Sequence, residues 1–196
     1  MQDEGYIKFQ CNWEKGPPPA AEFIDKLNHW RDLLFEKKLI GAYPDGIGYG
    51  NISIRFKANQ FIISGSATGH LSELTSAHYS LVTDFDTDYN QLTCEGPIKA
   101  SSESMSHGII YQLDQKVNAV IHVHHLDLWE KLIDFVPTTS PDVAYGTPEM
   151  ANEIQRLFYE TDLPKKKIFV MAGHEEGIFT FGKDMEEAGE VLREYL

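Results

Sequence analysis

The segment 119–125, AVIHVHH, constrains the fold most, because it places histidines in a run that otherwise predicts a buried strand. Alternate side chains of a strand share a face, so His122 and His124 point the same way, about 6.6 Å apart along the strand. Ile121 and Val123 then face the opposite layer. The segment therefore predicts an interior strand of a layered fold, with two imidazoles on one of its faces.

Strand-like and helical segments are interspersed along the rest of the chain. Phe23, Leu27, Trp30, Leu33 and Leu34 have helical spacing, and residues 48–56 and 59–66 predict a hairpin around the polar turn 57–59. Further helices are expected over 101–115, 126–135, 146–160 and 184–196, and further strands over 79–82 and 166–182. This order is typical of a layered α/β domain. We expect a single domain over 1–196, with residues 1–19 as an N-terminal extension.

The charge balance excludes several classes of partner. A formal net charge of -13 argues against nucleic acid and anionic membranes, because both demand clustered Lys and Arg. No stretch approaches the roughly 18 apolar residues of a membrane span. The two cysteines, Cys11 and Cys94, lack CxxC spacing, so neither a disulfide framework nor a cysteine zinc site is indicated. We expect a cytoplasmic enzyme that acts on a small molecule.

The paired histidines have the spacing from which two imidazoles can bind one metal ion. A catalytic zinc site typically takes three protein ligands and leaves a position open for water or substrate. His174 is the best-placed third candidate, because it follows the strand-like run IFVMAG within the turn GHEEG. The alternative is that His122 and His124 are hydrogen-bonded structural histidines of the core.

Polar residues before the histidine strand suggest a base and an anion pocket. Glu103 lies in the predicted first turn of a helix, with His107 one turn later, and a carboxylate near a divalent ion is a candidate general base. Its alternative role is to complement the helix dipole. Ser101 and Ser102 either cap this helix or bind an anion such as phosphate, and the small-residue loops 48–51 and 64–69 either approach a phosphate or are simply turns.

Together, in this order, these motifs resemble the class II aldolase/adducin family. The similarity covers about residues 20–192 and includes GNIS, ATG before LT, SSE followed by His107, the AVIHVH strand, YGTPEM and the late His174. The resemblance implies a three-layer α/β/α sandwich around a mixed, mostly antiparallel sheet. It also implies a homotetramer with active sites near subunit interfaces.

The resemblance further assigns roles to individual residues. His122, His124 and His174 match the ligands of a divalent metal ion, commonly zinc, and Glu103 matches the catalytic acid/base. The positions that match phosphate-binding residues are Asn51, Thr68, Gly69, Ser101 and Ser102. The expected activity is that of an aldolase-like lyase, which cleaves or forms a C–C bond in a small hydroxycarbonyl compound or sugar phosphate through a metal-stabilised enediolate. The alternatives are an epimerase or dehydratase on the same site, and a non-catalytic binding module like adducin.

The third-ligand turn departs from the family pattern. The family often has His-Gly at this point, whereas Glu175 and Glu176 stand between His174 and Gly177 here. We therefore expect the acidic pair to reshape the site.

Overall fold

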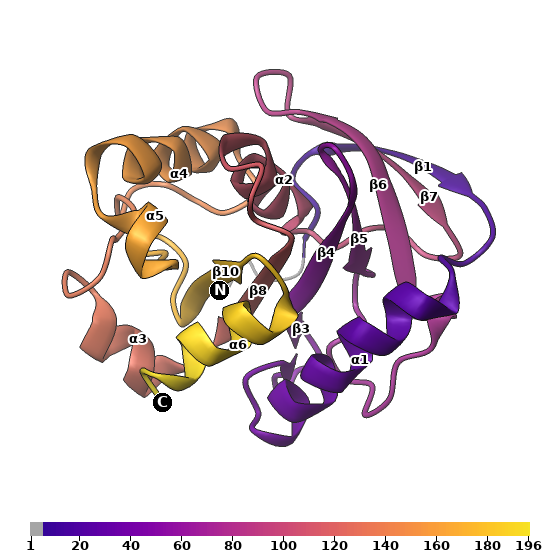
Figure 1. The fold of residues 1–196 in the computed structure, drawn as a ribbon, viewed down its shortest axis with the longest axis horizontal. Coiled ribbons are helices and arrows are strands. Elements are labelled where there is room, and N and C mark those ends of the chain that lie inside the picture. The colour runs from indigo at the N-terminus through magenta and orange to yellow at the C-terminus, as the bar shows by residue number, and fades with distance from the viewer. Residues whose placement is uncertain (1–5) are drawn as a thin grey trace.

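A computed structural model describes residues 6–196, in which the main element is an eight-stranded sheet (Figure 1). The strands lie in the order β1-β7-β6-β5-β4-β8-β10-β9. Only the pair β1 and β7 is parallel among these neighbours. The strands are β1 (Gln10–Lys15), β4 (Asn51–Lys57), β5 (Gln60–Ser64), β6 (Tyr79–Asp86), β7 (Gln91–Gly96), β8 (Ala119–His124), β9 (Ile168–Val170) and β10 (Gly177–Gly182).

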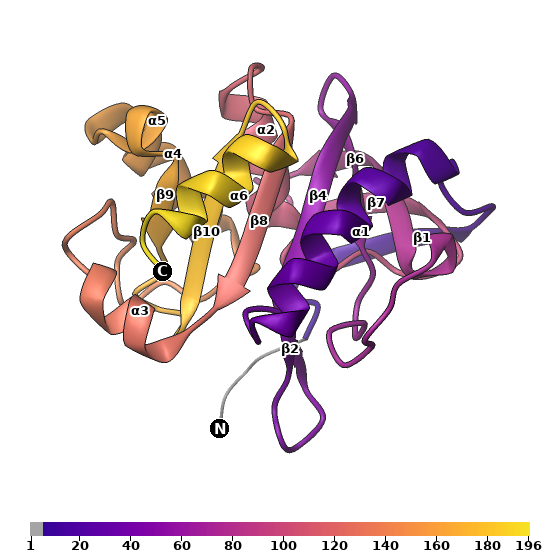
Figure 2. The ribbon, with the colours of Figure 1, turned by 60° about the horizontal axis from the view of Figure 1, so that its bottom comes forward.

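Helices cover both faces of this sheet, as Figures 1 and 2 show from two directions. The helices of one face are α1 (Ala21–Glu36), α3 (Leu126–Leu132) and α6 (Met185–Arg193). Those of the other face are α2 (Ser104–Leu113), α4 (Pro148–Glu160) and the short α5 (Leu163–Lys166). A small separate hairpin is made by β2 (Gly41–Ala42) and β3 (Gly48–Tyr49). The predicted α/β/α sandwich around a mixed, mostly antiparallel sheet is confirmed.

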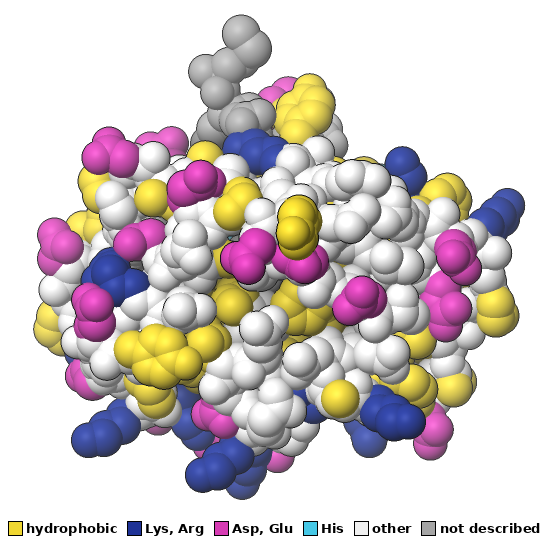
Figure 3. All heavy atoms as spheres, turned by 90° about the horizontal axis from the view of Figure 1, so that it is seen from above, with side chains coloured by type: hydrophobic (Ala, Val, Ile, Leu, Met, Phe, Trp, Pro, Cys, Tyr) yellow, Lys and Arg dark blue, Asp and Glu magenta, His cyan; other side chains and the backbone are white. Residues whose placement is uncertain are grey.

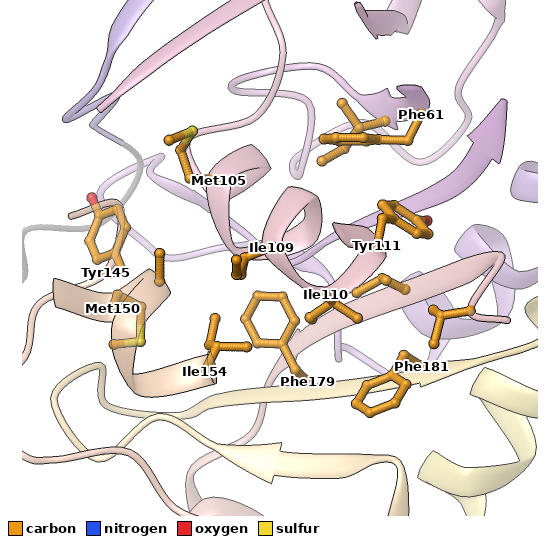
Figure 4. Close-up of a cluster of buried hydrophobic side chains, with 14 of the residues drawn as sticks. Phe61, Met105, Ile109, Ile110, Tyr111, Tyr145, Met150, Ile154, Phe179 and Phe181 are labelled. Atoms are coloured by element: carbon orange, nitrogen blue, oxygen red, sulfur yellow. The ribbon is translucent and has the colours of Figure 1, made fainter. Parts of the chain in front are cut away.

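Two hydrophobic clusters hold the layers together. Alternation along β8 sends Val120 into the cluster under α2 and α4, and Ile121 into the cluster under α1 and α6. Figure 4 shows the first cluster, in which Phe179 of β10 lies together with Ile109 and Ile110 of α2 and Ile154 of α4. Each fully buried aliphatic or aromatic side chain of this kind contributes about 1.5–3 kcal/mol relative to leaving it exposed.

The predicted helices and hairpin are confirmed, with local differences. In α1 the buried face includes Ile24, whereas Leu33 remains 37% exposed. Helix α4 begins as expected, because Thr147 accepts a hydrogen bond from Met150 N and Pro148 occupies the first turn. Thr75 is the N-cap of a short 3-10 helix, η1 (Ser76–His78), which leads directly into β6.

The predicted N-terminal extension contains a strand of the main sheet. Residues 10–15 form β1 and pair with β7 at one edge, while residues 1–5 lie outside the described part of the chain. The sequence did not predict this strand, since QCNWEK lacks a regular alternation of apolar and polar residues.

The start of α2 also differs from the prediction. Glu103 occupies the N-cap position rather than the first turn, and no side chain caps this helix. Ser101 instead forms a turn before the helix, because its carbonyl accepts from Ser104 N and its hydroxyl accepts from Glu103 N.

The surface agrees with the acidic composition. On the face seen in Figure 3, acidic side chains lie among neutral ones, and the Lys and Arg side chains are scattered rather than gathered into a tract. Within residues 6–196, no helix is both long and apolar enough to span a membrane.

Candidate metal and substrate site

The centre of the site is set by the ladder around β8. His122 pairs with Asn51 of β4 on one side and with Phe179 of β10 on the other, and His124 pairs with Gly177. The Phe179 ring stacks on the His122 imidazole, with 4.2 Å between the ring centroids. Strand geometry and this stacking together hold both imidazoles on the face that α2 and α4 cover.

The predicted third histidine reaches the same point. One ring nitrogen from each of His122, His124 and His174 lies within 4.8 Å of the others, and the Nε2 atoms of His122 and His124 are 3.1 Å apart. Two nitrogens at about 2.0–2.1 Å from a tetrahedral ion are about 3.3 Å apart, so the spacing suits a single ion. The structure therefore brings His174 to two histidines that lie about 50 positions earlier in the sequence.

The outer nitrogens of two of these rings have partners that orient them. Nδ1 of His122 lies 3.2 Å from the carbonyl oxygen of Ile178, and Nδ1 of His124 lies 2.9 Å from the Tyr43 hydroxyl. That hydroxyl in turn donates to Oε2 of Glu176 at 2.7 Å. A hydrogen on each Nδ1 leaves the Nε2 lone pair free to face an ion, which is the usual arrangement behind metal-binding histidines.

The electrostatics of the three rings also suit a cation. Burial lowers the pKa of His122, His124 and His174, and proximity of the rings to one another lowers it further for His122 and His174. Neutral imidazole is the form that binds metal. The His124 imidazole and the Tyr43 hydroxyl lower the pKa of Glu176, which adds negative charge behind His124. The donor set therefore fits a divalent ion of the zinc type.

Glu103 lies beside this cluster and is 1% exposed. Its Oε1 atom is 3.6 Å from Nε2 of His174 and accepts no hydrogen bond from residues 6–196. Its Oε2 atom accepts a 2.9 Å hydrogen bond from the Ser106 hydroxyl. Burial raises the pKa of Glu103 to about 7, although the Ser106 hydrogen bond opposes the shift. A carboxyl group with this pKa can both take up and release a proton near neutrality.

His107 links the helix to the opposite wall rather than to the three histidines. Its Nε2 lies 2.6 Å from Oδ1 of Asn51, and its Nδ1 lies 2.7 Å from the hydroxyl of Ser53, which also bonds Tyr111. Because an amide oxygen only accepts, Nε2 of His107 carries the hydrogen, and Ser53 donates to Nδ1. This network turns the amide nitrogen of Asn51 away from His107.

A cavity of ≈ 240 Å³ lies at the start of β4, and none of the three histidines is among its lining residues. Its wall includes Asn51, which pairs with His122, and Ser101 and Ser102, which immediately precede Glu103. All five residues predicted to bind phosphate line this one cavity: Asn51, Thr68, Gly69, Ser101 and Ser102. None of its lining residues within 6–196 is a Lys, an Arg or an acidic residue.

Arg31 of α1 holds one wall of the cavity in place through hydrogen bonds. Its buried guanidinium donates hydrogen bonds to the carbonyl oxygens of Thr68, Gly69 and Ser72. These bonds hold the turn that contains two of the predicted phosphate contacts. Sequence inspection did not find this residue, because a charged residue in an amphipathic helix usually lies on its solvated face.

Several other residues at the site were also missed. No motif or residue spacing in the sequence predicted that Tyr43 or Tyr111 contacts the site. The acidic pair of the GHEEG turn was predicted to reshape the site, and Glu176 belongs to that pair. The ring of Tyr145 lies 4.6 Å from that of His174, measured between centroids. His125 caps α3 by accepting from Leu128 N.

Comparison with known proteins gives a family match. Residues 44–129 match the family model described as the Class II Aldolase and Adducin N-terminal domain. A curated relative, methylthioribulose-1-phosphate dehydratase from Leptospira biflexa serovar Patoc, is 25% identical over 205 residues. That alignment covers 88% of this chain and 91% of the relative.

Solved structures share the fold. L-fuculose-1-phosphate aldolase from Thermus thermophilus has a TM-score of 0.61 at 22% identity, covering 90% of this chain and 87% of that one. A sugar-phosphate aldolase from Thermotoga maritima has a TM-score of 0.66 at 16% identity, covering 89% and 90%. The family match spans Glu103, His122 and His124, and the shared fold extends over nine tenths of the chain. The predicted resemblance to the class II aldolase/adducin family is therefore confirmed, by a family model over residues 44–129 and by a shared fold over most of the chain.

Proposed function

We propose that this chain is a zinc-dependent, aldolase-like lyase that cleaves or forms a C–C bond in a small hydroxycarbonyl phosphate. The observation that carries the proposal is the convergence of three buried, neutral imidazoles beside the buried carboxyl group of Glu103. Three nitrogen ligands leave a coordination position for substrate, and imidazole suits zinc better than magnesium or calcium. The residues assigned to the ion are His122, His124 and His174.

The proposed chemistry divides between the ion and the protein. A divalent ion at the three histidines supplies Lewis-acid stabilisation of negative charge on a substrate carbonyl oxygen. Glu103 moves the proton: Ser106 holds Oε2, so Oε1 is the atom that takes a proton from the substrate and returns it. Burial of the carboxyl group excludes bulk water, which would otherwise compete for that proton.

The cavity is the proposed phosphate subsite. The turn that Arg31 supports presents backbone groups of Thr68 and Gly69, and the hydroxyls of Ser101 and Ser102 lie on another part of the wall. The His107 network leaves the amide nitrogen of Asn51 as a further donor. Anchoring a remote phosphate in this way lets binding energy orient the reacting carbon atoms against Glu103.

A dehydratase is the second candidate, favoured by the curated relative named methylthioribulose-1-phosphate dehydratase. Dehydration begins with removal of a proton from the carbon next to an ion-polarised carbonyl, and C–C cleavage begins with removal of a proton from a substrate hydroxyl. One base beside one ion can do either, so the same histidines and Glu103 would serve both reactions. The two are separated by incubating the metal-loaded protein with L-fuculose 1-phosphate and, separately, with methylthioribulose 1-phosphate. Mass spectrometry distinguishes two carbonyl fragments, expected of a lyase of C–C bonds, from one product that has lost water.

We also propose the homotetramer that the sequence resemblance implies, and sedimentation of the native protein at four times the chain mass of 22.3 kDa would support it. A smaller assembly would rule out the tetramer without affecting the assignment of the ligands.

Removal of a histidine ligand should remove the metal. We expect wild-type protein purified without chelator to hold about one zinc or similar ion per chain, and His122→Ala and His174→Ala to hold almost none. His29→Ala is the matched control, since His29 lies on α1 across the sheet from the three ligands. Elemental analysis measures the ion, and circular dichroism verifies folding. A metal-free wild type after zinc loading would contradict the proposal.

Glu103→Gln should separate catalysis from metal binding. The amide keeps the shape of the side chain but cannot shuttle a proton, so we expect full metal content and a turnover lower by about 10²–10⁴-fold. Glu175→Gln, at an exposed neighbouring acidic position, is the control and should keep its turnover. Normal turnover in Glu103→Gln would disprove the acid/base role, and absence of turnover in the wild type on every phosphate tested would favour the adducin-like binding module.

A further inference from the structure

The two cysteines of the chain meet where β1 joins the sheet. Sγ of Cys11 on β1 lies 3.9 Å from Sγ of Cys94 on β7, although the residues are 83 positions apart. In the parallel ladder Cys11 pairs with Leu92 and Trp13 pairs with Cys94, so the two thiols are diagonal neighbours on one face. Both are free thiols. Neither cysteine belongs to the histidine cluster or to the substrate cavity.

The two thiols differ in access and acidity. Cys11 is half-buried, whereas Cys94 is fully buried beneath it. The Cys94 thiol donates to Cys11 and, together with the charge of Lys99, lowers the pKa of Cys11 to about 7. The same contact and burial raise the pKa of Cys94. An accessible thiolate with a protonated thiol behind it is the arrangement of an attacking and a resolving cysteine.

We propose that Cys11 and Cys94 form a reversible disulfide when the protein meets hydrogen peroxide. The Cys11 thiolate attacks one peroxide oxygen, the O–O bond breaks, and Cys11 becomes a sulfenic acid while the other oxygen leaves as water after protonation. The Cys94 sulfur then displaces the sulfenic oxygen as a second water, and the S–S bond forms. Two thiols are oxidised and one peroxide is reduced to two waters.

The bond would fasten the N-terminal strand to the sheet. β1 lies at an edge and is held by β7 alone among the described strands. The residues that precede it run toward the site: Phe9 is buried in the core, and Tyr6 lines the cavity and hydrogen-bonds Tyr145. The disulfide would therefore fix the segment that contributes Tyr6 to the cavity lining.

The test is peroxide titration of the reduced, full-length protein. One equivalent of hydrogen peroxide should lower the intact mass by the mass of two hydrogen atoms, and a non-reducing peptide map should join Cys11 to Cys94 within one chain. Thermal unfolding should shift upward by roughly 5–15 °C, because the link closes a long loop. Dithiothreitol should restore both the mass and the melting temperature.

Two single variants complete the test. In Cys94→Ser, Cys11 has no resolving partner and should gain oxygen as sulfenic and then sulfinic acid. In Cys11→Ser, the buried Cys94 should not react at the same dose. The proposal is overturned if the wild type does not react, or if it gains oxygen without forming a disulfide. It is overturned as well if the disulfide joins two chains, or if it forms within one chain and leaves the melting temperature unchanged. It is also overturned if Cys11→Ser reacts as the wild type does.

Discussion

His107 shows what a buried ionisable residue does for the site without contacting the proposed ion. It is fully buried between Asn51 and Ser53, and burial lowers its pKa to about 3. It therefore stays neutral at physiological pH, with its single hydrogen directed to Asn51. Protonation of Nδ1 would break the hydrogen bond that the Ser53 hydroxyl donates to it, since a protonated ring nitrogen cannot accept a hydrogen bond.

This burial predicts a specific acid sensitivity. The unfolded chain binds a proton at His107 near pH 6.5, whereas the folded chain does not until about pH 3. The neutral, buried His107 therefore costs no free energy of unfolding above pH 6.5. As the pH falls from 6.5 toward 3, the free energy of unfolding decreases by up to about 1.4 kcal/mol per pH unit because of this residue. His107→Gln should show a shallower fall in the free energy of unfolding than the wild type does over this window.

Urea unfolding between pH 8 and pH 4 measures this difference. His29→Gln is the control, because it makes the same substitution on helix α1, away from the network of Asn51 and Ser53. Parallel pH profiles for the wild type and His107→Gln would contradict the assignment of a neutral, buried His107.

At the residue scale, the sequence predicted only those site residues that belong to a regular alternation along a strand or to a recognisable motif. His122 and His124 follow from strand alternation, but Tyr43 does not, because its contact with His124 depends on how the loop after α1 passes the sheet. The same holds for Arg31, whose role depends on a turn about 40 positions later. Long-range contacts of this kind have no local signature in one sequence.

At the scale of elements, the turn between β9 and β10 determines where the third imidazole lies. Gly177 opens β10 opposite His124, and its Cα faces His174 directly. A Cβ atom added there would lie 2.7 Å from Cδ2 of His174 and 3.4 Å from Cε1 of His122. The glycine is thus needed for close approach of the imidazole.

Gly177→Ala should therefore displace His174 and weaken metal binding by about 10–100-fold, as for other changes just outside a ligand set. Zinc affinity measured by competition with a chelating dye reports the effect. The control is Gly16→Ala, where the nearest atom to an added Cβ is at 3.6 Å, an ordinary contact. Equal affinities in the two variants would show that the turn can relax around an extra methyl group.

Element boundaries were less predictable than element types. The helix near 101–115 was expected, but its start was misplaced because Ser101 forms its own turn with Ser104. This shift places Glu103 at the N-cap, where its side chain bonds Ser106 instead of capping the helix. Local hydrogen bonds from serine compete with helix capping, so single-sequence patterns do not decide between them.

At the scale of the whole molecule, a layered α/β domain was predictable because strand-like and helical segments are interspersed along the chain. The three-layer sandwich was expected only from the family resemblance. The edge strand β1 was not predictable: its pairing with β7 joins segments about 80 positions apart. Such non-local pairing depends on the finished sheet rather than on the propensity of QCNWEK.

The backbone contact at Gly69 limits how the proposed phosphate subsite can change its specificity. A side chain at Gly69 would collide with the Gly41 carbonyl and the Gly48 backbone, so this wall of the cavity is built from main chain packed on main chain. A substitution at Gly69 would therefore also require a change in the backbone of the β2–β3 hairpin. Acceptance of larger or smaller substrates must therefore evolve through other lining positions that carry side chains, such as Tyr6, Ile47 and Ser66.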